Sequence, residues 1–208
     1  MMITSSISGE GKSFTALNLA NIIALSGKKT LILGADMRKP RLYQELSLNN
    51  NLGLSNYLSG SSSWSEIIRE TEIENLSIIV SGPIPPNPGE LLLRGEFSSL
   101  IDKLKTKFDV IIIDTPPIGV VADALEVAPL VDHTLFIARQ NYTPKEAIVS
   151  LQHHLDQGKL KNISLVFNDI YKFGPGYGYG YGYSYGYGYG YGFGYGRKKN
   201  RGGYYEDS

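Results

Sequence analysis

The sequence contains no cysteine, which excludes disulfide bonds and metal sites built from thiolates. It has no run of about 18 apolar residues, the length that a membrane-spanning helix needs. Its first residues do not show the charged and then apolar pattern of a secretory signal. Only three histidines are present, and without cysteine or a spaced acidic cluster they do not predict a metal site.

The chain has no net charge, but its charges are unevenly distributed. From Tyr171 onward there are five basic and two acidic residues, which leaves 15 basic and 18 acidic residues in 1–170. A mildly acidic region is a poor candidate for holding the phosphates of a nucleic acid. We therefore expect no nucleic-acid partner.

Apolar runs alternate with helical patterns along the first 170 residues. The apolar runs are nearly continuous, as in strands that are buried on both faces of a parallel sheet. The predicted strands are 30–35, 76–81, 109–114, 133–138 and 163–167, and the predicted helices are 12–25, 90–107, 122–128 and 144–156. Gly27 is a plausible end for the first helix. This alternation predicts an α/β fold with a mostly parallel, doubly wound sheet.

The two ends of the chain depart from this pattern. Only four residues precede the first loop, whereas a central strand usually has about five or six, so most of the first strand is expected to be missing. Beyond Asp169 glycine and tyrosine replace the aliphatic residues that a core requires. We therefore predict one domain over 1–170 and a disordered Gly/Tyr-rich tail over 171–208.

The segment SSISGEGKS, residues 5–13, lies between the first strand and the first helix. It resembles GxxxxGK[ST], whose backbone N–H groups wrap phosphates at a helix N-terminus, although Ser6 replaces the first glycine. The alternative is an ordinary glycine-rich turn. The fold prediction thus becomes a P-loop NTPase, with nucleotide-binding residues Ser8, Gly9, Glu10, Gly11, Lys12, Ser13 and Phe14.

Two predicted strands end in acidic residues. Asp114 follows a buried strand, and ligands of open α/β sheets bind outside the carboxyl ends of the strands. Asp36 and Arg38 follow another strand. With Ser13, both aspartates are expected to hold Mg²⁺, and the set predicts metal-assisted phosphoryl transfer with Lys12 and Arg38 at the phosphates. The alternatives are a capping aspartate at 114 and a surface ion pair at Arg38.

Taken together, the motifs resemble the cytoplasmic domain of the BY-kinases, the bacterial protein-tyrosine kinases of capsule and exopolysaccharide export. The resemblance rests on TSSISGEGKSF, LILGADMRKPR, SGPIPPNPGELL, DVIIIDTPP, VVADAL and a tyrosine cluster, in this order. It implies phosphorylation of tyrosines with ATP and Mg²⁺. Lys12 and Ser13 match the family's Walker A motif, Asp36 and Arg38 its Walker A′ motif DxDxR, and Asp114 its Walker B motif.

The same resemblance implies further residues and partners. Asn168 is similar to the asparagine that contacts adenine in related P-loop proteins; a strand-ending turn residue is the alternative. The implied partners are other copies in a homo-oligomeric ring, a membrane chain-length regulator that is fused upstream or separate, and a protein-tyrosine phosphatase. The implied location is the cytoplasmic face of the bacterial inner membrane.

Three departures from related families matter. Gly34 stands where the first aspartate of DxDxR is expected, so either Asp36 takes over its role or activity is low. The N-terminal helix that builds the ring in the family is missing. Partition ATPases carry a second lysine five residues before the P-loop lysine, and that position is Ile7 here. A partition-type ATPase switch is therefore a less favoured alternative.

The tail places tyrosine at almost every second position, with glycine between. Because glycine leaves little bulk around each phenol, we expect these tyrosines to enter the active site of another copy, in trans. The expected autophosphorylation sites are Tyr177, Tyr179, Tyr181, Tyr183, Tyr185, Tyr187, Tyr189, Tyr191 and Tyr195. Phe193 interrupts the series and cannot accept phosphate. The third alternative is a catalytically weak assembly protein whose tail is its functional part.

Overall fold

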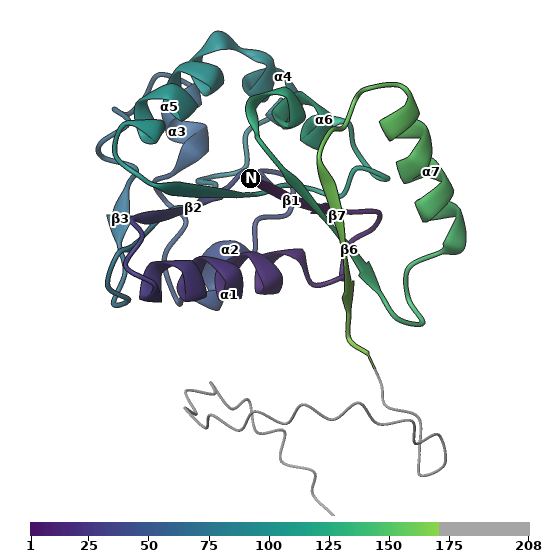
Figure 1. The fold of residues 1–208 in the computed structure, drawn as a ribbon. Helices are drawn as coiled ribbons and strands as arrows, with labels where there is room; N and C mark the ends of the chain where they lie inside the picture. Colours follow the sequence, from purple (N-terminus) through teal and green to yellow (C-terminus); the bar gives the residue numbers. More distant parts are fainter. Residues whose placement is uncertain (171–208) are drawn as a thin grey trace, which may run out of the picture. The chain divides into compact units, whose positions relative to one another are not determined.

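A computed structural model of the chain describes residues 1–170; the tail and its predicted phosphorylation sites lie outside the described residues. Residues 1–170 form a seven-stranded sheet in the order β3-β4-β2-β5-β1-β6-β7 (Figure 1). Every pair of neighbouring strands is parallel except β3 and β4, so the predicted mostly parallel sheet is confirmed. The strands are β1 (Met2–Ser5), β2 (Thr30–Gly34), β3 (Arg69–Glu70), β4 (Leu76–Ile79), β5 (Val110–Asp114), β6 (Thr134–Arg139) and β7 (Ile163–Asn168).

Helices cover both faces of the sheet, as the doubly wound prediction requires. Helices α1 (Lys12–Leu25) and α2 (Leu42–Glu45) pack on one face, in a cluster with Ile3, Ile32 and Ile112. A second cluster joins the other face to α3 (Leu54–Leu58), α4 (Pro88–Leu93), α5 (Gly95–Lys105), α6 (Asp123–Val127) and α7 (Lys145–Asp156). Figure 1 shows α1 and α2 on the side of the sheet opposite α3 to α6.

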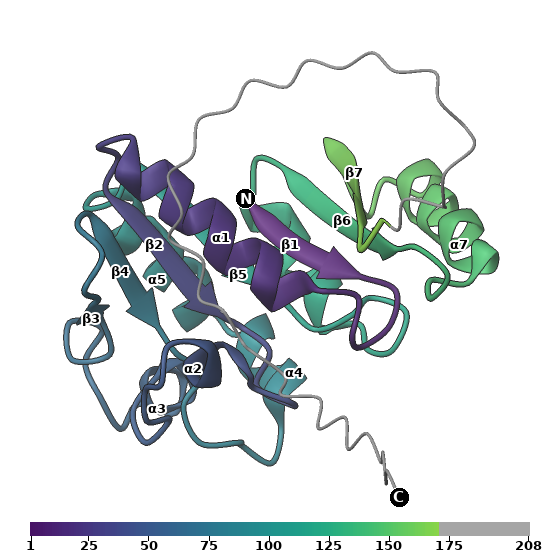
Figure 2. The same cartoon turned by 90° about the horizontal axis from the view of Figure 1, so that it is seen from below.

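The short first strand lies in the centre of the sheet. All four residues of β1 are buried, and β1 pairs with β5 on one side and β6 on the other. Helix α1 packs across the middle of the sheet through Ala16, Ala20 and Ala24, whose small side chains allow a close approach (Figure 2). The phosphate loop therefore joins a buried strand to a closely packed helix.

The structure corrects the sequence prediction in several places. The predicted helix over 90–107 is two helices, because Arg94 adopts an extended backbone (φ −71°, ψ 148°) between α4 and α5. Helices α2 and α3 and the antiparallel edge strand β3 were not predicted, since two to five residues show too little periodicity. Gly27, with φ 85°, ends α1 as expected.

Within residues 1–170, no helix combines the length and apolarity needed to cross a membrane.

Candidate active site

The phosphate loop depends on two glycines with left-handed backbone angles. Gly9 has φ 90° and Gly11, directly before α1, has φ 98°. L-amino acids with side chains rarely adopt these angles. Neighbouring groups also leave no space: a Cβ atom on Gly9 would lie 2.9 Å from Oη of Tyr142, and one on Gly11 would overlap the amide of Asn168. Glycine at these positions therefore lets the backbone N–H groups line an anion site without backbone strain.

The carboxylate of Glu10 holds the loop from inside. Glu10 is fully buried and accepts hydrogen bonds from Oγ of Ser6 (2.8 Å) and the backbone N–H of Ile7 (2.8 Å). Thr143, from the loop between β6 and α7, donates a further bond through Oγ1. Ser6, the departure from the usual P-loop pattern, thus supplies a side-chain tie within the loop.

Residues from β6, β7 and the loop after β6 hold the outer side of the phosphate loop. Asn168 donates to the carbonyl of Glu10 (2.9 Å), Tyr142 to the carbonyl of Ser8 (2.9 Å), and Arg139 to the carbonyl of Gly9 (3.1 Å). The sequence analysis named Asn168 but missed the other two and Thr143. Their only sequence signal is their position directly after a predicted strand.

Lys12 is the buried cation of the site. Only 8% of the residue is exposed, and burial lowers the pKa of its ammonium group, an effect opposed by the charges of Asp114, Asp36 and Glu10. Ser13, the next residue, donates a hydrogen bond of 2.6 Å from Oγ to Oδ2 of Asp114. The structure therefore brings together the predicted Walker A and Walker B residues.

Asp114 lies at the end of β5 and is 3% exposed. Burial raises the pKa of its carboxyl group to about 6, although the hydrogen bond from Ser13 and the charge of Lys12 act in the opposite direction. Within the described part of the chain, its Oδ1 atom is buried without a hydrogen-bond partner. A partly unsatisfied carboxylate beside a serine hydroxyl is a donor set that suits Mg²⁺. The residues present therefore fit the predicted metal.

Asp36 lies next to this centre, on the segment after β2. Its backbone N–H donates to the carbonyl of Asp114 (3.2 Å), and its Oδ1 accepts from the backbone N–H groups of Arg38 (3.2 Å) and Lys39 (3.0 Å). Its charge affects the pKa of both Asp114 and Lys12. Asp36 thus lies beside Asp114, and its part in holding the metal stays a prediction.

Arg38 points to a different partner. Its guanidinium group makes two hydrogen bonds to Asp123 of α6, at 2.7 and 3.0 Å, and this pairing raises the pKa of Arg38. The Asp123 side chain is 7% exposed, whereas that of Arg38 is 43% exposed. The ion pair lies beside Gly89 at the start of α4, since a Cβ atom there would be 3.0 Å from Oδ1 of Asp123. The sequence analysis did not single out Asp123.

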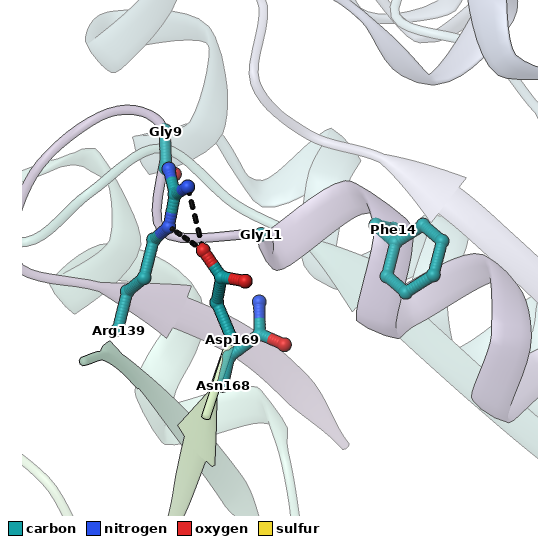
Figure 3. Close-up of a pocket in the computed structure, with 6 residues that line it drawn as sticks. All are labelled: Gly9, Gly11, Phe14, Arg139, Asn168 and Asp169. Atoms are coloured by element: carbon teal, nitrogen blue, oxygen red, sulfur yellow. Dashed lines mark hydrogen bonds and ion pairs between the residues drawn. The ribbon is translucent and has the colours of Figure 1, made fainter. Parts of the chain in front are cut away.

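A cavity of about 290 Å³ opens beside the phosphate loop (Figure 3). Figure 3 shows Arg139 reaching toward Gly9 and making an ion pair with Asp169, with Phe14 of α1 across the site from them. The shortest distance in that pair is 2.7 Å. The lining residues are Gly9, Gly11, Phe14, Arg139, Asn168 and Asp169. The predicted nucleotide-binding residues Phe14 and Asn168 therefore line one cavity with the loop glycines.

Comparison with known proteins assigns the family. Residues 2–131 match a family described as an AAA domain. The chain is 37% identical to the putative tyrosine-protein kinase CapB of Staphylococcus aureus, over 81% of this chain and 74% of CapB. It belongs to the bacterial tyrosine-protein kinases. The kinase domain of the Escherichia coli tyrosine kinase ETK superposes with a TM-score of 0.79 at 32% identity, covering 86% of this chain and 71% of that one.

Some bacterial tyrosine-protein kinases are much longer than this chain. The tyrosine-protein kinase ptk of Acinetobacter johnsonii is 40% identical over 80% of this chain, but the match spans only 23% of that protein. MinD of Pyrococcus horikoshii, a septum site-determining protein, matches with a TM-score of 0.64 at 22% identity, which shows the fold alone. The predicted resemblance is thus confirmed at the level of family and kinase domain.

Gly34 stands where the resemblance predicts the first aspartate of DxDxR. It ends β2 and is buried between β4 and β5. A Cβ atom at Gly34 would lie 3.0 Å from Oγ of Ser81 and 3.3 Å from its backbone nitrogen. Oγ of Ser81 lies 3.0 Å from the carbonyls of both Gly34 and Asp36. Ser81 therefore occupies the space into which an aspartate side chain would extend.

Proposed function

We propose that the chain transfers the γ-phosphoryl group of ATP to protein tyrosines, with Mg²⁺ as cofactor. The observation that carries the proposal is the junction of Lys12, Ser13 and Asp114, where a phosphate loop meets a buried carboxylate with one unpartnered oxygen atom. Phosphoryl transfer requires mainly positioning and charge neutralisation, and this junction offers both. Membership of the tyrosine-protein kinases supplies the acceptor, tyrosine.

In this proposal the phosphate loop binds the nucleotide. Backbone N–H groups of Ser8 to Ser13 surround the phosphates, and the ammonium group of Lys12 contacts the β- and γ-phosphates. Ser13 and Asp114 would hold Mg²⁺, which would supply positive charge beside the phosphate oxygens. Asp36 supplies a further carboxylate, as a second ligand or as the base for the tyrosine hydroxyl. Arg38 contacts phosphate when it leaves Asp123.

The cavity beside the loop is the proposed place for adenine. Phe14 is 61% exposed and offers an aromatic face. The side-chain nitrogen of Asn168 donates a hydrogen bond to the carbonyl of Glu10. The side-chain oxygen of Asn168 can therefore accept a hydrogen bond from the adenine amino group. In this proposal, the exposed ring and the fixed amide recognise the base.

The proposed substrate includes the kinase's own tail, the tyrosines from Tyr177 to Tyr195, presented in trans by another copy. Each phosphate would add about −1.5 to −2 charges at neutral pH, so several would turn a weakly basic tail strongly acidic. Such a change would weaken association between copies in a ring. We further propose a membrane chain-length regulator as activator, a protein-tyrosine phosphatase as antagonist, and a role in capsule or exopolysaccharide export at the cytoplasmic face of the inner membrane.

The direct test incubates the protein with ATP and Mg²⁺, with and without a candidate activator region, and detects phosphotyrosine by immunoblot. We expect a signal that Lys12→Met abolishes and that mass spectrometry assigns to the tail. Phosphate release without phosphotyrosine would favour a partition-type ATPase switch. No phosphotyrosine with any activator would exclude the kinase proposal for this chain.

One observation favours a second candidate, a catalytically weak assembly protein. Gly34 removes a family aspartate, and Ser81 occupies the adjacent space. If the wild-type protein shows only trace kinase activity and Gly34→Asp gains activity, assembly through the tail becomes the favoured function of the wild-type protein.

A further inference from the structure

Tyr142 is the exposed tyrosine of the region that the structure describes. Residues 1–170 contain three tyrosines, Tyr43, Tyr57 and Tyr142. Tyr43 and Tyr57 are partly buried against the two core clusters, whereas Tyr142 is 45% exposed. Tyr142 lies in the loop between β6 and α7, where another protein can reach it.

The phenol of Tyr142 is in direct contact with the phosphate loop. Its Oη donates to the carbonyl of Ser8 at 2.9 Å and lies 2.9 Å from the position of a Cβ atom on Gly9. The guanidinium carbon of Arg139 lies 5.0 Å from the centre of the tyrosine ring, and the same guanidinium donates to the carbonyl of Gly9. Ring and guanidinium together hold the outer side of the loop.

We propose that Tyr142 is a phosphorylation site, and that phosphate on its hydroxyl detaches this contact and weakens nucleotide binding. The inference rests on the proposed function, because the phosphate donor is ATP bound to a second copy of the chain. In the transfer, Oη forms a bond to the γ-phosphorus and the bond from that phosphorus to the bridging oxygen breaks. ADP leaves with that oxygen, and the phenolic proton passes to the base of the donor site.

Three physical effects give the modification its consequence. Phosphorylated Tyr142 has no hydroxyl proton to donate to Ser8. The Ser8 carbonyl oxygen lies only 2.9 Å from Oη, so it would repel the oxygens of a phosphate group there, and the ring has to move away. The added charge of about −1.5 to −2 then lies close to the loop that binds the ATP phosphates, and it attracts Arg139 away from the carbonyl of Gly9.

The first experiment maps the site. Lys12→Met, as acceptor, is incubated with the wild-type protein, ATP and Mg²⁺, and digested with trypsin. Cleavage after Arg139 and Lys145 releases residues 140–145 apart from the tail, and fragmentation distinguishes Tyr142 from Thr143. We expect phosphate on Tyr142, with the peptide that contains Tyr57 unmodified as internal control. Tail phosphorylation without Tyr142 phosphorylation overturns this inference alone, and absence of both overturns it together with the proposed function.

The second experiment measures the consequence without any kinase activity. Phosphotyrosine is installed at position 142 by genetic encoding, and binding of a fluorescent ADP analogue is measured in Mg²⁺. We expect the Kd to rise by about tenfold or more through charge repulsion. Tyr142→Phe loses the hydrogen bond but gains no charge, so we expect its Kd to rise much less.

Removal of the phosphate with a tyrosine phosphatase should restore the wild-type Kd, which separates a switch from misfolding. Equal affinities of the phosphorylated protein and Tyr142→Phe overturn the proposal.

Discussion

The two flanks of the active site differ in how deeply their charged side chains are buried. On the phosphate-loop flank, Glu10, Lys12 and Asp114 are buried, and residues from β6, β7 and the loop after β6 reach the loop from more than a hundred residues away. On the β2 flank, Arg38 and Lys39 are exposed, and the carboxylate of Asp36 accepts hydrogen bonds from the backbone N–H groups of these two residues. Both flanks have long-range contacts, so the difference between them is burial: the charged side chains are buried on the phosphate-loop flank, whereas Arg38 and Lys39 on the β2 flank are exposed.

This difference corresponds to what each flank is proposed to bind. ATP phosphates have the same shape in every turnover, so a pre-arranged loop binds them without reorganisation. Protein tyrosines arrive on segments of different sequence, and an exposed flank can adapt to them. The comparison predicts that changes on the phosphate-loop flank have the larger effects.

Lys12→Met should give the largest effect. Removing the ammonium group takes away a buried charge that faces the phosphates, and we expect phosphoryl transfer to fall about 100- to 1,000-fold. Rates of phosphotyrosine formation measure this. Lys28→Met, at an exposed lysine beyond α1, is the matched control and should retain wild-type rates. Equal losses in both variants would contradict the assigned role of Lys12.

Asp114→Asn should stabilise the nucleotide-free protein while it removes the response to Mg²⁺. Burial raises the pKa of Asp114 from 3.8 to about 6, so the folded state disfavours the charged form. The contribution of this group to stability therefore falls as the pH rises from about 4 to about 6, and stays low above that range. At neutral pH, the free energy of unfolding of Asp114→Asn should exceed that of the wild type by on the order of 2 kcal/mol.

Thermal unfolding at several pH values tests this expectation, with the difference between wild type and variant as the measured quantity. The difference should shrink toward pH 4, where both side chains are neutral in the folded state. In the presence of ADP and Mg²⁺ the wild type should become the more stable of the two proteins, because these ligands stabilise only the protein that binds them. If Asp114→Asn were less stable than the wild type without ligand, the buried carboxylate of Asp114 would have to be stabilised by a further interaction.

Gly34→Asp tests whether the missing family aspartate fits this fold. The new Cβ would press on Ser81, and overpacking of this kind costs about 1–3 kcal/mol. We expect lower stability in urea unfolding and partial recovery in the double variant with Ser81→Ala. Gly34→Ala separates the effect of space from that of charge. A stable single variant would show that Ser81 moves aside readily.

The Arg38–Asp123 pair should give the smallest effect, with a definite asymmetry. Arg38→Met leaves a nearly buried carboxylate without its cation and should cost about 1–2 kcal/mol. Asp123→Asn leaves an arginine that water can reach and should cost less than about 1 kcal/mol. A double-mutant cycle by urea unfolding measures the coupling, and the double variant should recover part of the loss of Arg38→Met. Equal costs would contradict the asymmetry.

Much of this site could be predicted from short sequence motifs. The loop glycines, Lys12, Ser13 and Asp114 follow from a P-loop after a strand and an acidic residue ending another strand, because parallel strands end at one edge of the sheet. The doubly wound fold could also be predicted, because nearly continuous apolar runs alternate with helical patterns along the sequence.

The supporting residues could not be predicted, because their partners are distant in sequence. Thr143 meets Glu10 only through the register that places β6 beside β1, and Asp123 meets Arg38 only through the packing of α6. The break at Arg94 did have a sequence signal that the sequence analysis did not use, because Gly95 follows it directly and glycine often ends a helix.

The central position of β1 determines when the site can form during synthesis. Met2 pairs with Ile113 on one side and Thr134 on the other, and Ser5 pairs with Ile137. The first strand therefore leaves the ribosome long before either neighbour exists, and contacts so far apart in sequence form late in folding. A nascent chain that stops short of β6 has the phosphate loop in its sequence but lacks the surroundings that shape it. Nucleotide binding should thus begin only after almost the whole domain has been made.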